Sequence, residues 1–160
     1  MSEIEDIILD NDQRGVSALR IHLPNNFCEI AAQIILDNPG PVLICTGFLI
    51  LSARSPETDG PPGAYFLGQA LEQLGHSVTY VTDIYSAFLF KDLVSAERII
   101  EFPIISGDES KELANKTLGK INPSIVIGIE RCGLTNGNMY LKYLERLEKH
   151  YVNQNLQESY

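Results

Sequence analysis

The stretch that decides the fold is residues 41–48, "PVLICTGF", a β-rich run without a single charged side chain. A strand that is apolar on both sides is typical of a parallel sheet whose two faces are both covered. Two more runs of this kind follow, "HSVTYVTD" at 76–83 and "SIVIGIER" at 124–131, with a shorter one, "RIIEFPI", at 98–104. Helical patterns separate them. This alternation predicts an α/β fold with three layers, in which a mostly parallel, Rossmann-like sheet carries helices on both faces.

The predicted helices lie before and between these strands. Short helical turns are expected at 3–9 and 15–22, and helices at 26–37, 64–74, 84–97, 108–123 and within 138–152. Asp108 or Ser110 is the expected cap of the helix at 108–123. Residues 1–150 therefore make one α/β domain, long enough for a core of its own, and residues 151–160 are a polar tail.

The charge balance limits the classes of partner. Twelve Lys and Arg residues stand against 21 Asp and Glu, which gives a formal net charge of −9. Nucleic acid and anionic membranes both require a basic surface, so neither is expected as a partner. A small anionic substrate is still compatible, because a few arginines can reverse the field inside a cleft. The acidic first residues are not a signal or transit peptide, and no apolar run is long enough to span a membrane.

Polar residues follow the ends of the three long apolar runs. Ligands of open parallel sheets bind beyond the carboxyl ends of the strands, so the residues that follow these ends are expected to share one cleft. The first strand ends at Thr46 and Gly47 and leads into an acidic loop, the second ends at Asp83, and the third ends at Glu130. The predicted cleft residues are Glu57, Asp59, Asp83, Glu130 and Arg131.

The acidic loop continues into a helix start with unusual chemistry, "ETDGPPGA" at 57–64. Pro61 and Pro62 lack an N–H, so they stiffen the first turn and remove two of its donors. The N–H groups of Gly63 and Ala64 are expected to receive one carboxylate, with Gly63 allowing a close approach.

Simpler roles are open for these residues. Asp59 and Asp83 could each cap a helix, Glu57 could be a solvated loop acid, and Glu130 with Arg131 could form a surface ion pair. A divalent cation, Mg²⁺ or Mn²⁺, held by these carboxylates is a further alternative. Nucleotide binding finds no support, because neither GxGxxG nor GxxxxGK[ST] occurs.

Several blocks of sequence together resemble one family. They are "IEDIILDNDQRGVSAL" at 4–19, "TGF" at 46–48, "ETDGPPGA" at 57–64, "VTD" at 81–83 and "IERCGLTNGNMY" at 129–140. Their order and spacing are similar to those of the D-glutamate cyclase carboxy-terminal domain family over about residues 3–140. After Tyr140 the sequence departs from the family pattern, which continues into a later acidic, glycine-rich loop. The chain therefore resembles the first half of the family's domain with a divergent ending.

The resemblance implies a carbon–oxygen hydro-lyase of D-amino acid metabolism that converts D-glutamate to 5-oxo-D-proline and water. It also implies a location in the mitochondrial matrix or the cytoplasm. For that reaction Arg131 is the expected clamp for one carboxylate and the loop before the helix at 64–74 receives the other. Glu130 and Asp83 are candidates for the base, and Glu57 or Asp59 for the acid. The expected substrate-binding residues are Thr46, Gly47, Gly60, Gly63, Ala64 and Arg131.

Two other classes of function are compatible with the same sequence. One is an inactive, truncated paralogue that binds an amino acid or another small anion without turnover. The other is a protein-interaction module, and a homo-oligomer is compatible with each of these functions. An exposed apolar sheet edge or face near the carboxyl terminus would favour the interaction module. A closed cleft in which Glu57, Asp83 and Glu130 converge would favour the enzyme or the binding module.

Overall fold

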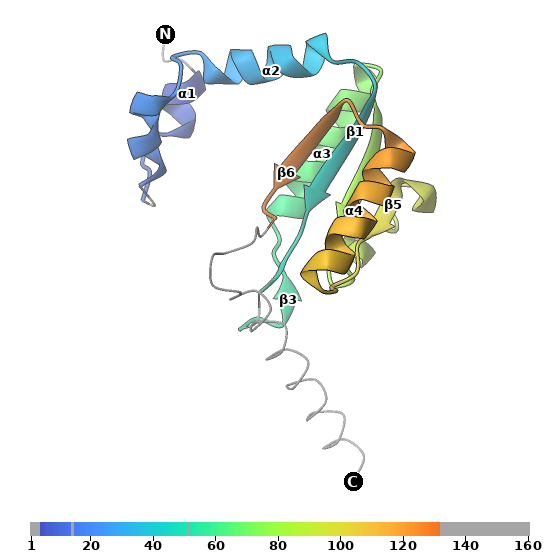
Figure 1. The fold of residues 1–160 in the computed structure, drawn as a ribbon. Coiled ribbons are helices and arrows are strands. Elements are labelled where there is room, and N and C mark those ends of the chain that lie inside the picture. The colour runs from blue at the N-terminus through green and yellow to red at the C-terminus, as the bar shows by residue number, and fades with distance from the viewer. Residues whose placement is uncertain (1–3, 14, 51, 132–160) are drawn as a thin grey trace.

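A four-stranded parallel sheet is the centre of the structure (Figure 1). The structure is a computed structural model that describes residues 4–13, 15–50 and 52–131. The strands are β1 (Pro41–Thr46), β4 (Ser77–Thr82), β5 (Ile99–Glu101) and β6 (Ile125–Ile129), in the order β5-β4-β1-β6. All three pairings are parallel, and β1 lies between β4 and β6. The prediction that the three long apolar runs lie side by side in a parallel sheet is confirmed.

Helices α3 (Gly60–Gln73) and α4 (Gly107–Ile121) lie on opposite faces of the sheet (Figure 1). The predicted α/β layering is therefore present. Alternate residues of β1 and β4 point toward α3 and form the core with it, since successive strand side chains point to opposite faces. The buried core comprises Val42, Ile44, Ala64, Leu71, Val78, Tyr80, Phe90 and Val94. A Cβ at Gly68 of α3 would run into the hydroxyl of Tyr80, so this glycine allows α3 to approach β4 closely.

The stretch 84–97 is not the helix that the sequence predicts. It forms two short 3-10 turns, η2 (Ala87–Phe90) and η3 (Ala96–Arg98). Asp83 accounts for the difference, because its carboxylate accepts the Tyr85 N–H and its carbonyl accepts the N–H groups of Ser86 and Ala87. Such local bonding by an aspartate competes with a regular helix.

Other element boundaries agree with the prediction only in part. Helix α3 begins at Gly60, which agrees with the expected place of Pro61 and Pro62 in its first turn and lies four residues before the stretch 64–74. The acidic loop contains a short hairpin of β2 (Leu49–Ile50) and β3 (Ser55–Pro56). Helix α4 is capped by Ser106 and not by Asp108 or Ser110, because Ser106 and Glu109 form a reciprocal capping box. The helix predicted within 138–152 lies outside the described residues.

The first described elements form an arm that projects from the start of β1 (Figure 1). The arm comprises α1 (Ile4–Ile8), η1 (Val16–His22) and α2 (Phe27–Asp37). Glu5 connects its two helices, since its carboxylate accepts the N–H of Cys28 at 2.9 Å. Across the part of the chain that the structure describes, no helix combines the length and the apolar character needed to cross a membrane.

Candidate functional site

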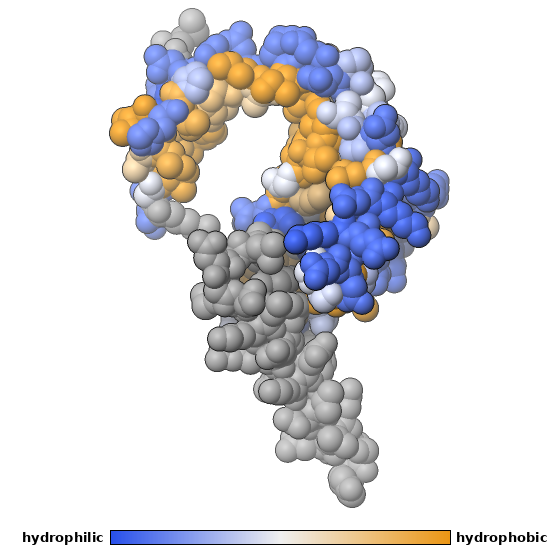
Figure 2. Space-filling model, in the orientation of Figure 1, coloured by the Kyte–Doolittle hydropathy of each residue, from blue (hydrophilic) through white to orange (hydrophobic). Residues whose placement is uncertain are grey.

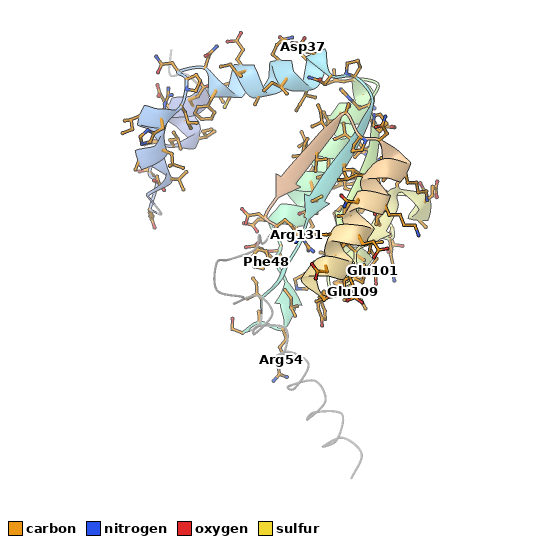
Figure 3. The ribbon with its side chains drawn as sticks, viewed as in Figure 1. Asp37, Phe48, Arg54, Glu101, Glu109 and Arg131 are labelled. Atoms are coloured by element: carbon orange, nitrogen blue, oxygen red, sulfur yellow. The ribbon has the colours of Figure 1, made fainter. Side chains whose placement is uncertain are left out.

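The carboxyl ends of β1, β4 and β6 are joined by one arginine. Arg131 follows β6, and its Nη1 lies 2.5 Å from Asp83 Oδ2, after β4, and 2.6 Å from the carbonyl oxygen of Gly47, after β1. Figure 3 shows Arg131 near Phe48, below the end of the sheet, with Arg54 well away on the β2–β3 hairpin. The prediction that residues after the strand ends lie close together is thus met by Gly47, Asp83 and Arg131.

Asp83 is a buried carboxylate with both oxygens engaged. It is 1 % exposed, Oδ1 accepts the Tyr85 N–H at 3.0 Å, and Oδ2 accepts from Arg131. A carboxylate removed from water needs such a charged partner, because burial of an unpaired charge is very costly. Both hydrogen bonds that Arg131 makes to described residues use Nη1. The other N–H groups of this guanidinium can therefore donate to an anion.

Three fully buried hydroxyl groups lie at the same strand ends. Thr46, Thr82 and Ser86 are each 0 % exposed, and their hydroxyls have no hydrogen-bond partner among the residues that the structure describes. A Cβ at Gly47 would approach Ser86 Oγ to 2.7 Å and Thr82 Oγ1 to 2.8 Å, which locates both hydroxyls against this glycine. Buried hydroxyls are usually paired, so an unpaired group calls for an explanation such as a ligand or water nearby.

Of these three residues, only Thr46 was predicted from the sequence to belong to the site, and Thr82 and Ser86 were not. The signal for Thr82 was its position, since it is a polar residue at the end of an apolar strand directly before Asp83. Ser86 lies in the stretch for which a helix was predicted, so nothing in the sequence placed it at the strand ends. Both were found through the tertiary structure alone.

Glu130 lies beside the start of α3. A Cβ at Gly60 would come within 2.6 Å of Glu130 Cβ and 3.1 Å of Thr46 Oγ1, so position 60 requires glycine. Glu130 itself is exposed and has a φ of 46°, a left-handed conformation that residues other than glycine seldom adopt. With Phe48, Gly128 and Arg131 it lines an open cavity of about 300 Å³. Strain of this kind is common at functional sites.

The start of α3 differs from the predicted carboxylate site. The N–H of Gly63 donates to the carbonyl of Asp59 at 3.2 Å, and Ala64 is 0 % exposed within the core. Neither residue can receive a substrate carboxylate in the way the sequence analysis expects. Because Pro61 and Pro62 have no N–H, the N–H of Gly60 is the donor left within the first turn.

The prolines instead help to line an apolar groove of about 440 Å³. Its walls are Thr58, Pro61, Pro62, Tyr65, Phe66, Leu89, Phe90 and Leu93. A groove of this composition does not suit a ligand with two carboxylates. The polar site is therefore the cavity at Arg131 and Glu130.

The structure does not bring Glu57 and Asp59 to that cavity. Glu57 is half-buried after β3, Asp59 is exposed before α3, and neither lines the 300 Å³ cavity. Asp59 occupies the N-cap position of α3, as the simpler prediction has it, but its side chain makes no capping hydrogen bond. Within the described ranges no three His, Cys, Asp or Glu side chains gather closely enough to hold a metal ion. A divalent cation, Mg²⁺ or Mn²⁺, stays a prediction of the sequence, because one or two carboxylates can suffice for Mg²⁺.

Cys45 lies near this site without being an activated thiol. Burial raises the pKa of its thiol, while the positive charge of Arg131 acts in the opposite direction with a smaller effect. A raised pKa keeps the thiol protonated and poorly nucleophilic at neutral pH. Cys45 is thus a packing residue of β1.

Comparison with known proteins bears on the identity of this site. A family described as D-glutamate cyclase-like, C-terminal, matches residues 4–154, and so extends beyond Tyr140, where the resemblance in the sequence was expected to end. No curated protein and no solved structure matches the chain. Because the match spans far more than half of the sequence, this chain belongs to the D-glutamate cyclase-like C-terminal family.

Proposed function

We propose that the protein is a hydro-lyase that converts D-glutamate to 5-oxo-D-proline and water. The observation that carries this proposal is Arg131, held by Asp83 at the strand ends beside the exposed carboxylate of Glu130. In a member of a D-glutamate cyclase-like family, a cation and a carboxylate at one cavity suit a substrate with two carboxylates and one ammonium group.

Arg131 is the proposed anchor for one substrate carboxylate. Its Nη1 is engaged by Asp83 and Gly47, so the guanidinium is oriented before the substrate arrives. Such preorganisation reduces the ordering cost of binding. The N–H of Gly60, at the start of α3, is a second donor for an anionic group near Glu130.

The reaction forms a bond between the α-nitrogen and the γ-carboxyl carbon and breaks a bond from that carbon to oxygen. Overall the α-ammonium loses two protons and the departing oxygen gains two, so the reaction releases water and no net proton. Glu130 is the proposed proton carrier, because its exposed carboxylate can take a proton from the nitrogen and return it to the oxygen. Arg131 and the Gly60 N–H would stabilise negative charge on the γ-carboxyl group during the attack.

Asp83 has a positioning role in this proposal. It is buried and both of its oxygens accept hydrogen bonds, so it orients Arg131 rather than exchanging protons with the substrate. One observation favours binding without turnover as the second candidate function. Glu57 and Asp59, which the sequence analysis expected as the acid, do not line the cavity.

Turnover and binding can be separated by measuring both. The purified chain is incubated with D-glutamate or L-glutamate, 5-oxoproline is followed by chiral chromatography, and binding is measured by calorimetry. We expect 5-oxo-D-proline from D-glutamate only. Binding of D-glutamate without product would support the second candidate, and neither binding nor product would overturn both.

Three variants test the assigned roles. Glu130→Gln should bind D-glutamate but lose turnover, because the amide carries no titrating proton. Arg131→Lys keeps the charge next to Asp83 but loses the planar set of donors, so it should weaken binding. Arg54→Met, on the hairpin away from the cavity (Figure 3), is the matched control and should change neither the binding of D-glutamate nor its turnover.

A further inference from the structure

We propose that the arm, residues 4–37, binds a second copy of this chain beside strand β6, and that two copies exchange their arms in this way. The arm and the outer side of β6 face a common hollow (Figure 2). Each copy would insert its arm into the hollow of the other. The proposal does not depend on the chemistry at Arg131.

The arm exposes far more apolar surface than it buries. Ten of the 17 exposed large hydrophobic side chains of the described residues lie on it, and η1 and α2 contain no buried residue. Ile4, Ile7, Ile21 and Ile34 are exposed to 64, 62, 85 and 54 %. Scattered exposed apolar residues are ordinary, but a contiguous set marks an interaction surface.

The apolar side chains of the arm gather on one side of it. In α2 the polar residues Glu29, Gln33 and Asp37 recur along one side, at the spacing of a helical stripe. Figure 2 shows the polar side of the arm turned outward and the hydrophobic side turned toward the hollow. The uncovered side is therefore the side that faces β6.

Strand β6 is uncovered on the other side of the hollow. It is an edge strand, since the described strands pair only with its β1 side. Val126 is 55 % exposed and Gly128 is also exposed. Strands of parallel sheets are normally covered on both faces, and an open edge invites further chain to pack against it.

A second copy fits because one chain carries both surfaces. An occupant of the hollow must contact the apolar side of the arm and the edge at β6, and the arm of another copy supplies apolar side chains from α1, η1 and α2. A reciprocal exchange about a two-fold axis covers the apolar side of the arm and the β6 edge in both copies at once. No copy is then left with an uncovered surface that could bind a third chain. The arm meets the sheet through Asn38, Pro39 and Gly40, a short connection of the kind that permits exchange. Ten apolar side chains are a substantial part of the roughly 20–30 residues that each partner contributes to a standard interface.

The oligomeric state of the full chain tests this proposal by light scattering and sedimentation velocity at micromolar concentrations. We expect a dimer for the wild type and monomers for Ile34→Glu on the arm and Val126→Glu on β6. Phe66→Glu is the matched control, because Phe66 is 70 % exposed on α3, outside both surfaces, and should stay dimeric. Thermal melts should show that the monomeric variants remain folded. A monomeric wild type would overturn the proposal, as would a dimer that tolerates both substitutions.

Mixing the two monomeric variants tests the exchange itself. Ile34→Glu keeps an intact β6 edge and Val126→Glu keeps an intact arm, so a mixture can bring one intact arm against one intact β6 edge, while the arm side of that hollow still carries Ile34→Glu. We expect mixed dimers that dissociate more readily than the wild type. If the arms instead paired only with each other, Val126→Glu alone would stay dimeric, and the exchange would be refuted.

Discussion

Arg131 Nη1 lies 2.5 Å from Asp83 Oδ2, although 48 residues separate them in the sequence. The same nitrogen donates to the carbonyl of Gly47, so one side chain joins the ends of three parallel strands. Asp83 is buried and Arg131 is about a quarter exposed. The pair therefore holds the strand ends together and orients the guanidinium toward the cavity.

Removal of one partner of this pair should be worse than removal of both. Arg131→Met leaves the buried Asp83 carboxylate without its cation and should destabilise the protein by about 3–5 kcal/mol. The double variant Asp83→Asn with Arg131→Met should recover part of that loss, because no charge is then left unpaired. Urea denaturation of both single variants and the double variant measures the coupling. Strictly additive losses would mean that the two side chains do not stabilise one another.

Gly47 should tolerate no side chain. Its φ of 92° disfavours any other residue, and an added Cβ would lie 2.7 Å from Ser86 Cβ. Gly47→Ala is therefore expected to destabilise the fold by about 3 kcal/mol or more. The matched control is Gly63→Ala, because nothing lies within 4 Å of a Cβ there and alanine favours a helix by about 0.5–1 kcal/mol. Thermal melts of the two variants should shift in opposite directions, and equal shifts would contradict the described strand ends.

Gly68 should be required for the packing of α3 on β4. An added Cβ would collide with the Tyr80 side chain, which is 0 % exposed, so Gly68→Ala should cost about 1–3 kcal/mol through overpacking. Gly119→Ala in α4, where a Cβ meets nothing within 4 Å, is the control and should be neutral or stabilising. Chemical denaturation of both variants checks this. A stable Gly68→Ala would show that α3 lies further from the sheet.

The capping box of α4 predicts a pH dependence. Hydrogen bonds from the Ser106 hydroxyl and backbone N–H lower the pKa of Glu109. A carboxylate whose folded pKa lies below its unfolded value adds stability above the unfolded pKa, near 4.5, and that stability is lost as the pH falls through the folded pKa. Glu109→Gln should thus be less stable than the wild type at neutral pH, and the difference should vanish in acid.

Ser106→Ala separates the cap from the charge. Loss of the Ser106 hydroxyl should cost about 1 kcal/mol near neutral pH, because the Glu109 N–H loses its acceptor. In acid, where Glu109 is protonated, part of that cost should persist. Melting temperatures measured across the acidic range for both variants check the two contributions. A pH-independent difference between Glu109→Gln and the wild type would contradict the lowered pKa.

The sequence by itself determined the sheet and the helices that cover it. The apolar run "PVLICTGF" predicts a strand covered on both faces, and β1 fits this prediction because Val42, Leu43 and Ile44 are all buried. Strand β6 departs from it, since Val126 is 55 % exposed.

The sequence also predicted that Glu57, Asp59, Asp83, Glu130 and Arg131 would share one cleft, since parallel strands end at one edge. The structure joins Asp83 to Arg131 and places Glu130 beside Arg131 at the cavity, but it does not bring Glu57 and Asp59 there.

Only the tertiary structure decided what each polar residue does at that edge. It placed the Gly63 N–H in a helical bond, engaged both oxygens of Asp83, and brought Ser86 against Gly47 from a stretch predicted to be helical. It also revealed the arm as an uncovered apolar surface, although its helices were predicted. The physical reason is that hydrogen-bond partners and burial depend on contacts between residues far apart in the chain. Local sequence sets the strands and helices, but the partner of each polar group is chosen by packing.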